Sequence, residues 1–155
     1  MAAHQAPEML RVSVESLCLQ ILAMELGPVH AFLGEALDTP AQGVLDAAIK
    51  DLREVGAIRK CPTKGLWELT ELGTHLARMP VDAKLGRMLV YGAVMGCVEP
   101  VLTIAATMSA RSPFVCPMDK RDEANRAREA FAQERDLSDH ILYVRVYEAW
   151  QQVRG

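Results

Sequence analysis

Apolar residues recur at helical spacing through the first third of the chain. Over residues 14–26 they return every three or four positions, and Gly27-Pro28 ends the run. A second short helix is expected over residues 29–37. A clearer one carries its apolar side chains between residues 44 and 55, with Gly56 where a left-handed terminal residue belongs. The pattern therefore predicts three amphipathic helices in succession.

A change of period follows these helices. Residues 57–61 and 66–69 read as two short strands joined by a Pro-Thr-Lys-Gly turn, which predicts a β-hairpin. Thr70 is a suitable N-cap for a helix over residues 71–79, and Pro80 disfavours helical geometry before it. Three helices followed by a small hairpin predict a winged-helix domain over residues 1–79.

The second half is expected to be all-α. One helical stripe with small residues is formed by Leu85, Met88, Leu89, Gly92, Ala93 and Gly96. Glu99-Pro100 then opens a run over 101–108 that is apolar nearly all round, typical of a helix buried at the centre of its domain. A solvated helix over 120–136, capped by Asp119, and an amphipathic helix over 137–153 complete the bundle. The inward candidates of that last helix are Leu142, Val146, Trp150 and Val153. We therefore predict a mainly α protein in which residues 80–155 form the second domain.

Composition and charge limit the functions to consider. The chain has 155 residues, 50% of them hydrophobic, and a net charge of −3, so any nucleic-acid contact must be local. Residues 1–79 carry 7 basic and 10 acidic side chains, and residues 80–155 carry 10 of each. The sequence shows no membrane-spanning run and no leader, which predicts an intracellular protein without resolving nucleus from cytoplasm.

The four cysteines suggest neither a metal site nor a disulfide framework. They are widely and irregularly spaced, without a CxxC pair, so we expect reduced thiols. Two of them, Cys18 and Cys97, lie within apolar helical patterns where a thiol acts as a small hydrophobe.

No catalytic site is predicted for this chain. It contains no GxxxxGK[ST] loop to hold phosphates and magnesium. The sequence Asp-Glu-Ala-Asn at residues 122–125 resembles an ATPase signature, but it lies in a polar, charge-alternating segment without the buried strand that such a motif requires. We interpret it as a coincidence, and we expect no cofactor in this chain.

Two groups of residues in the second half are candidates for RNA contact. Ser138, Asp139 and His140 could present a helix N-terminus, a hydroxyl and an imidazole, although Ser-Asp at a helix start also serves capping alone. A basic rim could include Arg111, Lys120 and Arg121, together with Arg126 and Arg128. Interleaved acidic residues favour a solvated ion-pair face there instead.

The predicted wing carries a third group of candidates. Arg59, Lys60, Lys64 and Trp67 could bind a nucleic-acid duplex or a partner protein. The alternative is a surface hairpin with a packed Trp67, which the acidic surroundings favour. Tyr143, Tyr147 and Trp150 are expected in the core or at a domain interface, with stacking on RNA as the minor alternative.

Several motifs in order resemble the C-terminal part of DEAH-box RNA helicases. They are PEMLR at residues 7–11, LCLQ at 17–20, LTELG at 69–73 with LARMPVD at 76–82 and LGRML at 85–89, CVEPVLTIAATMS at 97–109 with Pro113-Phe114, and Ser138-Asp139-His140 followed by Tyr147 and Trp150. The resemblance implies a winged helix followed by a ratchet domain, here C-terminally incomplete.

The resemblance also implies a function and partners. The ratchet would form one wall of a single-stranded RNA channel, and the winged helix would brace RecA-like motor domains of the same polypeptide, where ATP and Mg²⁺ bind. A glycine-patch activator protein is a further possible partner. A free-standing winged-helix nucleic-acid binder and a protein-docking module remain alternatives.

Overall fold

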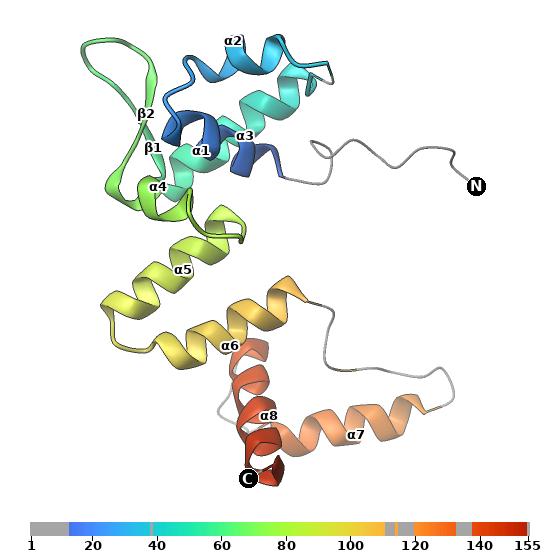
Figure 1. Cartoon of the computed structure of the whole chain (residues 1–155). Helices are drawn as coiled ribbons and strands as arrows, with labels where there is room; N and C mark the ends of the chain where they lie inside the picture. Colours follow the sequence, from blue (N-terminus) through green and yellow to red (C-terminus); the bar gives the residue numbers. More distant parts are fainter. Residues whose placement is uncertain (1–12, 38, 111–113, 115–119, 133–137, 155) are drawn as a thin grey trace. The chain divides into compact units, whose positions relative to one another are not determined.

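The computed structural model describes residues 13–37, 39–110, 114, 120–132 and 138–154 (Figure 1). The chain forms two compact units, residues 1–90 and 91–155, called unit 1 and unit 2 below. The domain boundary predicted at residues 79 and 80 stays a prediction. Within the described ranges, the helices lack the length and apolar character that a bilayer crossing demands.

The predicted helices of the first third are present in unit 1. They are α1 (Val14–Ala23), α2 (Val29–Gly34) and α3 (Gln42–Val55). The Ser13 hydroxyl caps α1 by accepting a hydrogen bond from the Ser16 N–H at 3.2 Å. Both α1 and α2 are shorter than predicted. Beyond α1, Glu25 and Gly27 adopt positive φ angles of 54° and 108°, which helical backbone does not allow.

The predicted hairpin follows α3. Strands β1 (Ile58–Lys60) and β2 (Trp67–Leu69) pair antiparallel, with Arg59 opposite Glu68. Helix α4 (Glu71–Leu76) begins after Thr70, whose hydroxyl accepts from the Gly73 N–H at 3.0 Å. The predicted cap and hairpin are therefore confirmed, although α4 ends three residues before Met79.

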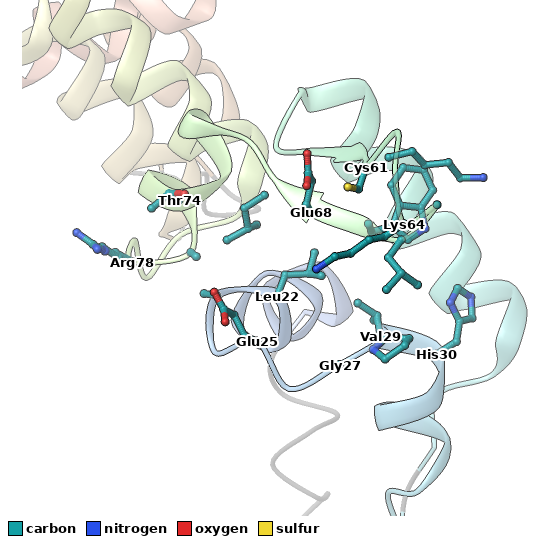
Figure 2. A pocket seen from close by; sticks show the side chains of 18 residues that line it. Leu22, Glu25, Gly27, Val29, His30, Cys61, Lys64, Glu68, Thr74 and Arg78 are labelled. Atoms are coloured by element: carbon teal, nitrogen blue, oxygen red, sulfur yellow. The ribbon is translucent and has the colours of Figure 1, made fainter.

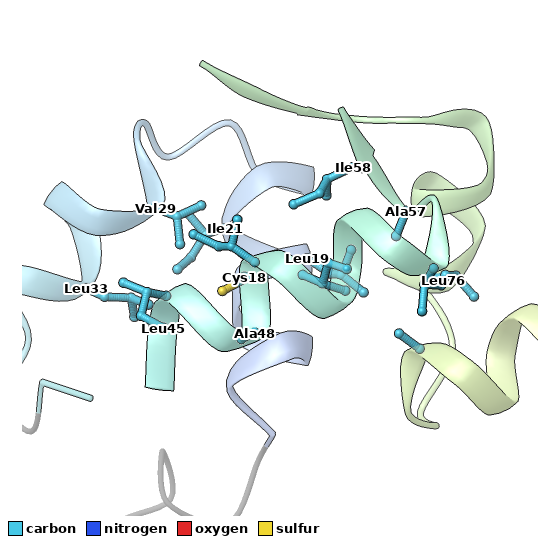
Figure 3. Close-up of a cluster of buried hydrophobic side chains, with 14 residues drawn as sticks. Cys18, Leu19, Ile21, Val29, Leu33, Leu45, Ala48, Ala57, Ile58 and Leu76 are labelled. Carbon is cyan, nitrogen blue, oxygen red and sulfur yellow. The ribbon is translucent and has the colours of Figure 1, made fainter. Parts of the chain in front are cut away.

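One apolar core holds unit 1 together (Figure 3). It lies between α1, α3, the hairpin and α4, and Leu52 and Cys18 are fully buried at its centre. Trp67 and Leu69 pack against the same cluster from β2. The buried side chains are Cys18, Leu19, Ile21, Val29, Leu33, Leu45, Ala48, Ile49, Leu52, Val55, Ala57, Ile58, Leu76 and Ala83.

Helix α5 (Ala83–Val94) begins within unit 1. Asp82 caps it by accepting from the N–H groups of Lys84 at 3.0 Å and Leu85 at 2.9 Å. The Arg87 guanidinium donates to the Val55 carbonyl at 3.0 Å, which satisfies a backbone acceptor at the C-terminus of α3. The start of α5 is therefore fastened to the winged helix.

Unit 2 contains the end of α5 with α6 (Val98–Ser109), α7 (Arg121–Phe131) and α8 (Asp139–Arg154). Both α6 and α7 pack on α8. At the end of α5, Gly92 lies so close to Val101 that an added Cβ would be 3.0 Å from the valine Cβ. The architecture is mainly helical, as predicted, with the hairpin as the only sheet in the described residues.

The expected burial of α6 is wrong for this chain. The helix forms, but of its hydrophobic residues only Ala105 is buried, and Leu102 is 55% exposed. Within the described part of unit 2, α8 and the end of α5 at Gly92 pack against α6, and these contacts do not enclose a helix that is apolar nearly all round.

Two smaller expectations also need correction. Leu142 of α8 is buried, but Trp150 and Val153, which lie in the C-terminal part of the same helix, are 49% and 89% exposed. Cys97 is exposed at the N-cap of α6 rather than packed within a helix. Cys18, Cys61 and Cys97 are free thiols, and Cys116 lies outside the described residues.

Candidate RNA-contact and partner-docking surfaces

The wing brings its predicted site residues onto two faces of one hairpin. On the outer face, Arg59 Nε donates to Glu68 Oε1 at 2.8 Å across the strands. On the core-side face, the Lys60 ammonium lies 5.4 Å from the centre of the Trp67 ring, a cation–π contact between directly opposed residues. Trp67 is half-buried and packs against the core, as expected for a packed wing residue.

The turn of the wing is held by its backbone and by a thiol. The Cys61 N–H donates to the Leu66 carbonyl at 2.8 Å, and Gly65 closes the turn with a φ of 66°. Cys61 Sγ lies 3.2 Å from Thr63 Oγ1. This hydroxyl, with the backbone N–H groups of the turn, lowers the pKa of the Cys61 thiol. The hydrogen bond from Arg59 is the main cause that lowers the pKa of the Glu68 carboxyl.

A groove of about 950 Å³ runs between the wing and the connector from α1 to α2, and we call it the wing groove (Figure 2). Leu22, Glu25 and Val29 lie on the connector side, and the wing residues 60–61 and 64–69 form the opposite wall. Thr74 and Arg78 lie at one end. The groove therefore gathers Lys60, Lys64 and Trp67 of the predicted wing set, and Arg59 is not among its lining residues.

Sequence reasoning missed the other wall of this groove. Arg78, Glu25 and His30 come from segments that the hydrophobic pattern describes only as helix ends and connectors. His30 Nε2 lies 3.1 Å from Asp46 Oδ1, which joins the start of α2 to α3. Because the groove exists only once α1 and the hairpin pack together, no local signal in the sequence could have predicted it.

At the start of α8, the predicted residues first serve the helix itself. The Ser138 hydroxyl accepts from the His140 N–H at 3.3 Å, which is the capping arrangement. Asp139 Oδ1 accepts from Arg128 Nη2 at 2.7 Å, so it ties α7 to α8. The His140 side chain is exposed. An RNA contact by these residues stays a prediction.

The predicted basic rim is only partly described. Lys120 forms an exposed ion pair with Glu123 at 3.7 Å, and Arg121 is exposed at the first position of α7. Arg111 lies outside the described residues. Arg128, besides its bond to Asp139, lies 5.6 Å above the Phe114 ring, which is itself 5.9 Å from the Tyr143 ring. An RNA contact by the rim stays a prediction.

The far end of α8 carries an exposed aromatic set. The rings of Tyr147 and Trp150 stack with centroids 5.8 Å apart, and the Arg154 guanidinium lies 4.7 Å from the Trp150 ring. Tyr147 is 43% exposed and Trp150 is 49% exposed. The two rings are therefore accessible in this chain and do not belong to its buried core. The domain-interface role and stacking on RNA both stay predictions.

Comparison with known proteins gives two concordant findings. Residues 82–143 match the family described as "Helicase associated domain (HA2), ratchet-like". The chain is 42% identical over 151 residues to the ATP-dependent RNA helicase DHX29 of Homo sapiens, a match over 97% of this chain and 11% of that protein.

Other similar proteins are also named as helicases. The DExH-box ATP-dependent RNA helicase DExH3 of Arabidopsis thaliana is 42% identical over 97% of this chain and 12% of its own length. The ATP-dependent DNA/RNA helicase DHX36 of Rattus norvegicus is 41% identical over 97% and 14%, respectively. The chain thus spans between a tenth and a seventh of the length of these three relatives.

Proposed function

Because this chain belongs to the DEAH-box RNA helicase family, as part of its helicase-associated region, we propose that it is an accessory module of an ATP-dependent RNA helicase. In this role, unit 2 contributes one wall of the path of single-stranded RNA, and the winged helix braces the motor domains. ATP and Mg²⁺ bind to those RecA-like domains of the same polypeptide. The module itself carries out no chemistry.

The observation that carries this proposal is the extent of the similarity. Identity of about two residues in five runs across 97% of the chain, through both units, with proteins named as ATP-dependent RNA helicases. A resemblance confined to the winged helix would have fitted many nucleic-acid binders equally well. The shared ratchet-like segment at residues 82–143 favours the helicase role over a free-standing winged-helix binder.

The RNA-facing residues that we propose lie on α8. His140 and Tyr147 are seven residues apart, which is about two helical turns, so they lie on the same side of the helix. Trp150 stacks on Tyr147 and continues this surface with Arg154. Exposed aromatic rings beside a guanidinium suit unpaired bases, and stacking of one base on such a ring contributes about 1–3 kcal/mol.

The proposal is tested in the polypeptide that joins this chain to its motor domains. Trp150→Ala should raise the RNA concentration that half-maximally stimulates ATP hydrolysis by about tenfold, consistent with the loss of one stacked base. Hydrolysis without RNA should not change. Val153→Ala, which shortens an apolar side chain 89% exposed on the same helix, is the matched control.

Two results would contradict this assignment. If Trp150→Ala and Val153→Ala behave alike, α8 does not stack on RNA. If Trp150→Phe, which retains an aromatic ring, is as defective as Trp150→Ala, the tryptophan acts through packing rather than through stacking. Binding of ATP by the isolated chain would contradict the accessory role itself.

A further inference from the structure

Strand β2 has one edge without a hydrogen-bonding partner. The Cys61 N–H donates to the Leu66 carbonyl and the Thr70 N–H donates to the Ala57 carbonyl, so Cys61–Leu66 and Ala57–Thr70 are hydrogen-bonded pairs of the hairpin. In an antiparallel ladder such pairs alternate along the strands, so Glu68 directs its backbone groups toward β1. Trp67 and Leu69 therefore direct their N–H and C=O groups to the opposite edge.

Nothing in the described part of the chain satisfies these four backbone groups. The two-stranded sheet ends at β2, and no described backbone or side-chain group forms a hydrogen bond with the N–H or C=O of Trp67 or Leu69. Both residues line the wing groove, which separates β2 from the connector between α1 and α2. An open strand edge beside a groove is the arrangement to which an extended peptide adds as a further strand.

The charges around this edge select the kind of peptide. Lys60, Lys64 and Arg78 line the groove, and no described carboxylate lies within ion-pair distance of them. Of the two carboxylates in the lining, Glu68 is already bound by Arg59 at 2.8 Å, which leaves Glu25. The groove is thus locally positive within a half of the chain that is acidic overall, with 7 basic against 10 acidic residues.

We propose that the wing groove binds an extended, acidic segment of a partner protein, which pairs with the outer edge of β2. The backbone of the segment would bond to Trp67 and Leu69, and its carboxylates would face Lys60, Lys64 and Arg78. RNA suits this site less well. The edge offers alternating donors and acceptors, which a polypeptide backbone matches, and the acidic remainder of unit 1 repels a long polyanion.

The test uses the whole chain and a short synthetic peptide that alternates glutamate and valine. A Trp150→Phe background leaves Trp67 as the reporting fluorophore, since the chain has two tryptophans. The peptide should change Trp67 emission, and the amides of Trp67 and Leu69 should exchange hydrogen more slowly once it binds. The Cys61 amide, already bonded within the hairpin, should keep its exchange rate.

Variants separate the two parts of the proposal. Lys64→Glu combined with Arg78→Glu should weaken peptide binding by about tenfold or more, because it reverses two exposed cations of the groove. Lys50→Glu, at a side chain 72% exposed on α3 and outside the groove, should leave binding unchanged. A peptide with proline at alternate positions lacks the N–H groups that strand pairing needs and should not bind.

The contrary results are equally specific. Equal weakening by Lys50→Glu, or binding of the proline peptide, would show attraction by general charge without strand pairing and overturn the proposal. Stronger binding of a lysine-valine peptide would overturn the assignment of charge. Protection of the Trp67 and Leu69 amides by oligouridine, but not by the acidic peptide, would assign the groove to RNA. None of these results depends on the role of α8 in the helicase.

Discussion

The two units of this chain bury apolar surface in different ways. Unit 1 wraps α1 with α2, α3, α4 and β2, and fourteen hydrophobic side chains form one buried cluster. In the described part of unit 2, both α6 and α7 pack against α8, and the buried hydrophobic residues are Ala105 and Leu142. Similar helical sequences therefore give a self-contained domain in one case and an open helical layer in the other.

The difference shows what an apolar sequence pattern does and does not determine. Periodic apolar residues are sufficient to predict a helix, but burial also requires enough neighbouring elements to surround it. Unit 1 supplies these elements itself. The apolar side chains of α6 and α8 that remain exposed, among them Leu102 and Trp150, are in keeping with the accessory role proposed above.

The largest expected effect is the loss of a core side chain. Leu52→Ala should destabilise unit 1 by about 4 kcal/mol, because Leu52 is fully buried at the centre of a packed cluster. Leu142→Ala should destabilise unit 2 by about 2 kcal/mol, at the low end of the range for such changes, because its surroundings are sparse and can collapse. Urea unfolding followed by Trp67 for unit 1 and Trp150 for unit 2 separates the two effects.

A common unfolding transition at both tryptophans would contradict the expected difference in stability between the units. Single-tryptophan variants, Trp67→Phe and Trp150→Phe, are the controls that assign each signal. If Leu52→Ala and Leu142→Ala shift both signals equally, the units unfold together, and the open packing of unit 2 has no separate thermodynamic consequence.

A second prediction concerns close packing in unit 1. A Cβ added at Gly73 of α4 would collide with the carbonyl of Ala57 and approach the Leu69 side chain, so Gly73→Ala should cost about 2–3 kcal/mol. Gly43→Ala is the matched control, since an added Cβ on this α3 residue meets nothing within 4 Å. It should stabilise the chain by up to about 1 kcal/mol through helix propensity. Thermal denaturation of both variants measures the contrast, and equal midpoints would contradict the close packing of α4 against Ala57 and β2.

Much of unit 1 could be predicted from the sequence because its signals are local. Thr70 before an apolar run, Gly56 after one, and the Pro-Thr-Lys-Gly turn each act within a few residues, and each is found in the predicted place. Helix lengths were less predictable. Glu25 adopts a left-handed conformation that its residue type does not signal, so α1 ends earlier than its apolar pattern.

The candidate sites were less predictable than the elements that carry them. The charged wing residues were visible in the sequence, but the wing groove depends on Arg78 and Glu25, which only tertiary packing brings beside Lys64. Similarly, the Arg128 bond to Asp139 joins α7 to α8 between residues that are eleven positions apart in the sequence. Such sites arise from long-range contacts, which leave no regular spacing along the chain.

A third prediction uses the exposed apolar surface of unit 2. The chain should bind a hydrophobic dye such as anilinonaphthalene sulfonate in its native state, because Leu102 and Met108 of α6 are 55% and 50% exposed. Leu102→Gln should reduce dye emission while changing stability by no more than about 0.5 kcal/mol, as expected for a surface position. Val44→Gln, at a side chain 51% exposed on α3 of unit 1, is the control. If both variants reduce emission equally, the dye does not distinguish the units.

The smallest effect is electrostatic and belongs to unit 1. Burial, and next the nearby Asp51, raise the pKa of Glu15 at the start of α1 above its usual value of 4.5, with Asp82 acting in the same direction and Lys84 against it. The folded state thus holds the Glu15 proton more tightly than the unfolded state does, and the ionised carboxylate opposes folding at neutral pH.

Glu15→Gln should therefore raise the urea midpoint of unit 1 slightly at pH 7, and the gain should shrink as pH falls through the raised pKa toward and below 4.5, where the wild-type carboxyl is also neutral. Glu54→Gln removes an exposed partner of Lys50 at 3.9 Å and should have little effect or the opposite sign. Urea unfolding followed by Trp67 fluorescence at pH 7 and below pH 4.5 measures these changes in midpoint. A gain that persists unchanged at low pH would mean that glutamine acts through packing or helix propensity, and that the charge of Glu15 does not oppose folding of the winged helix.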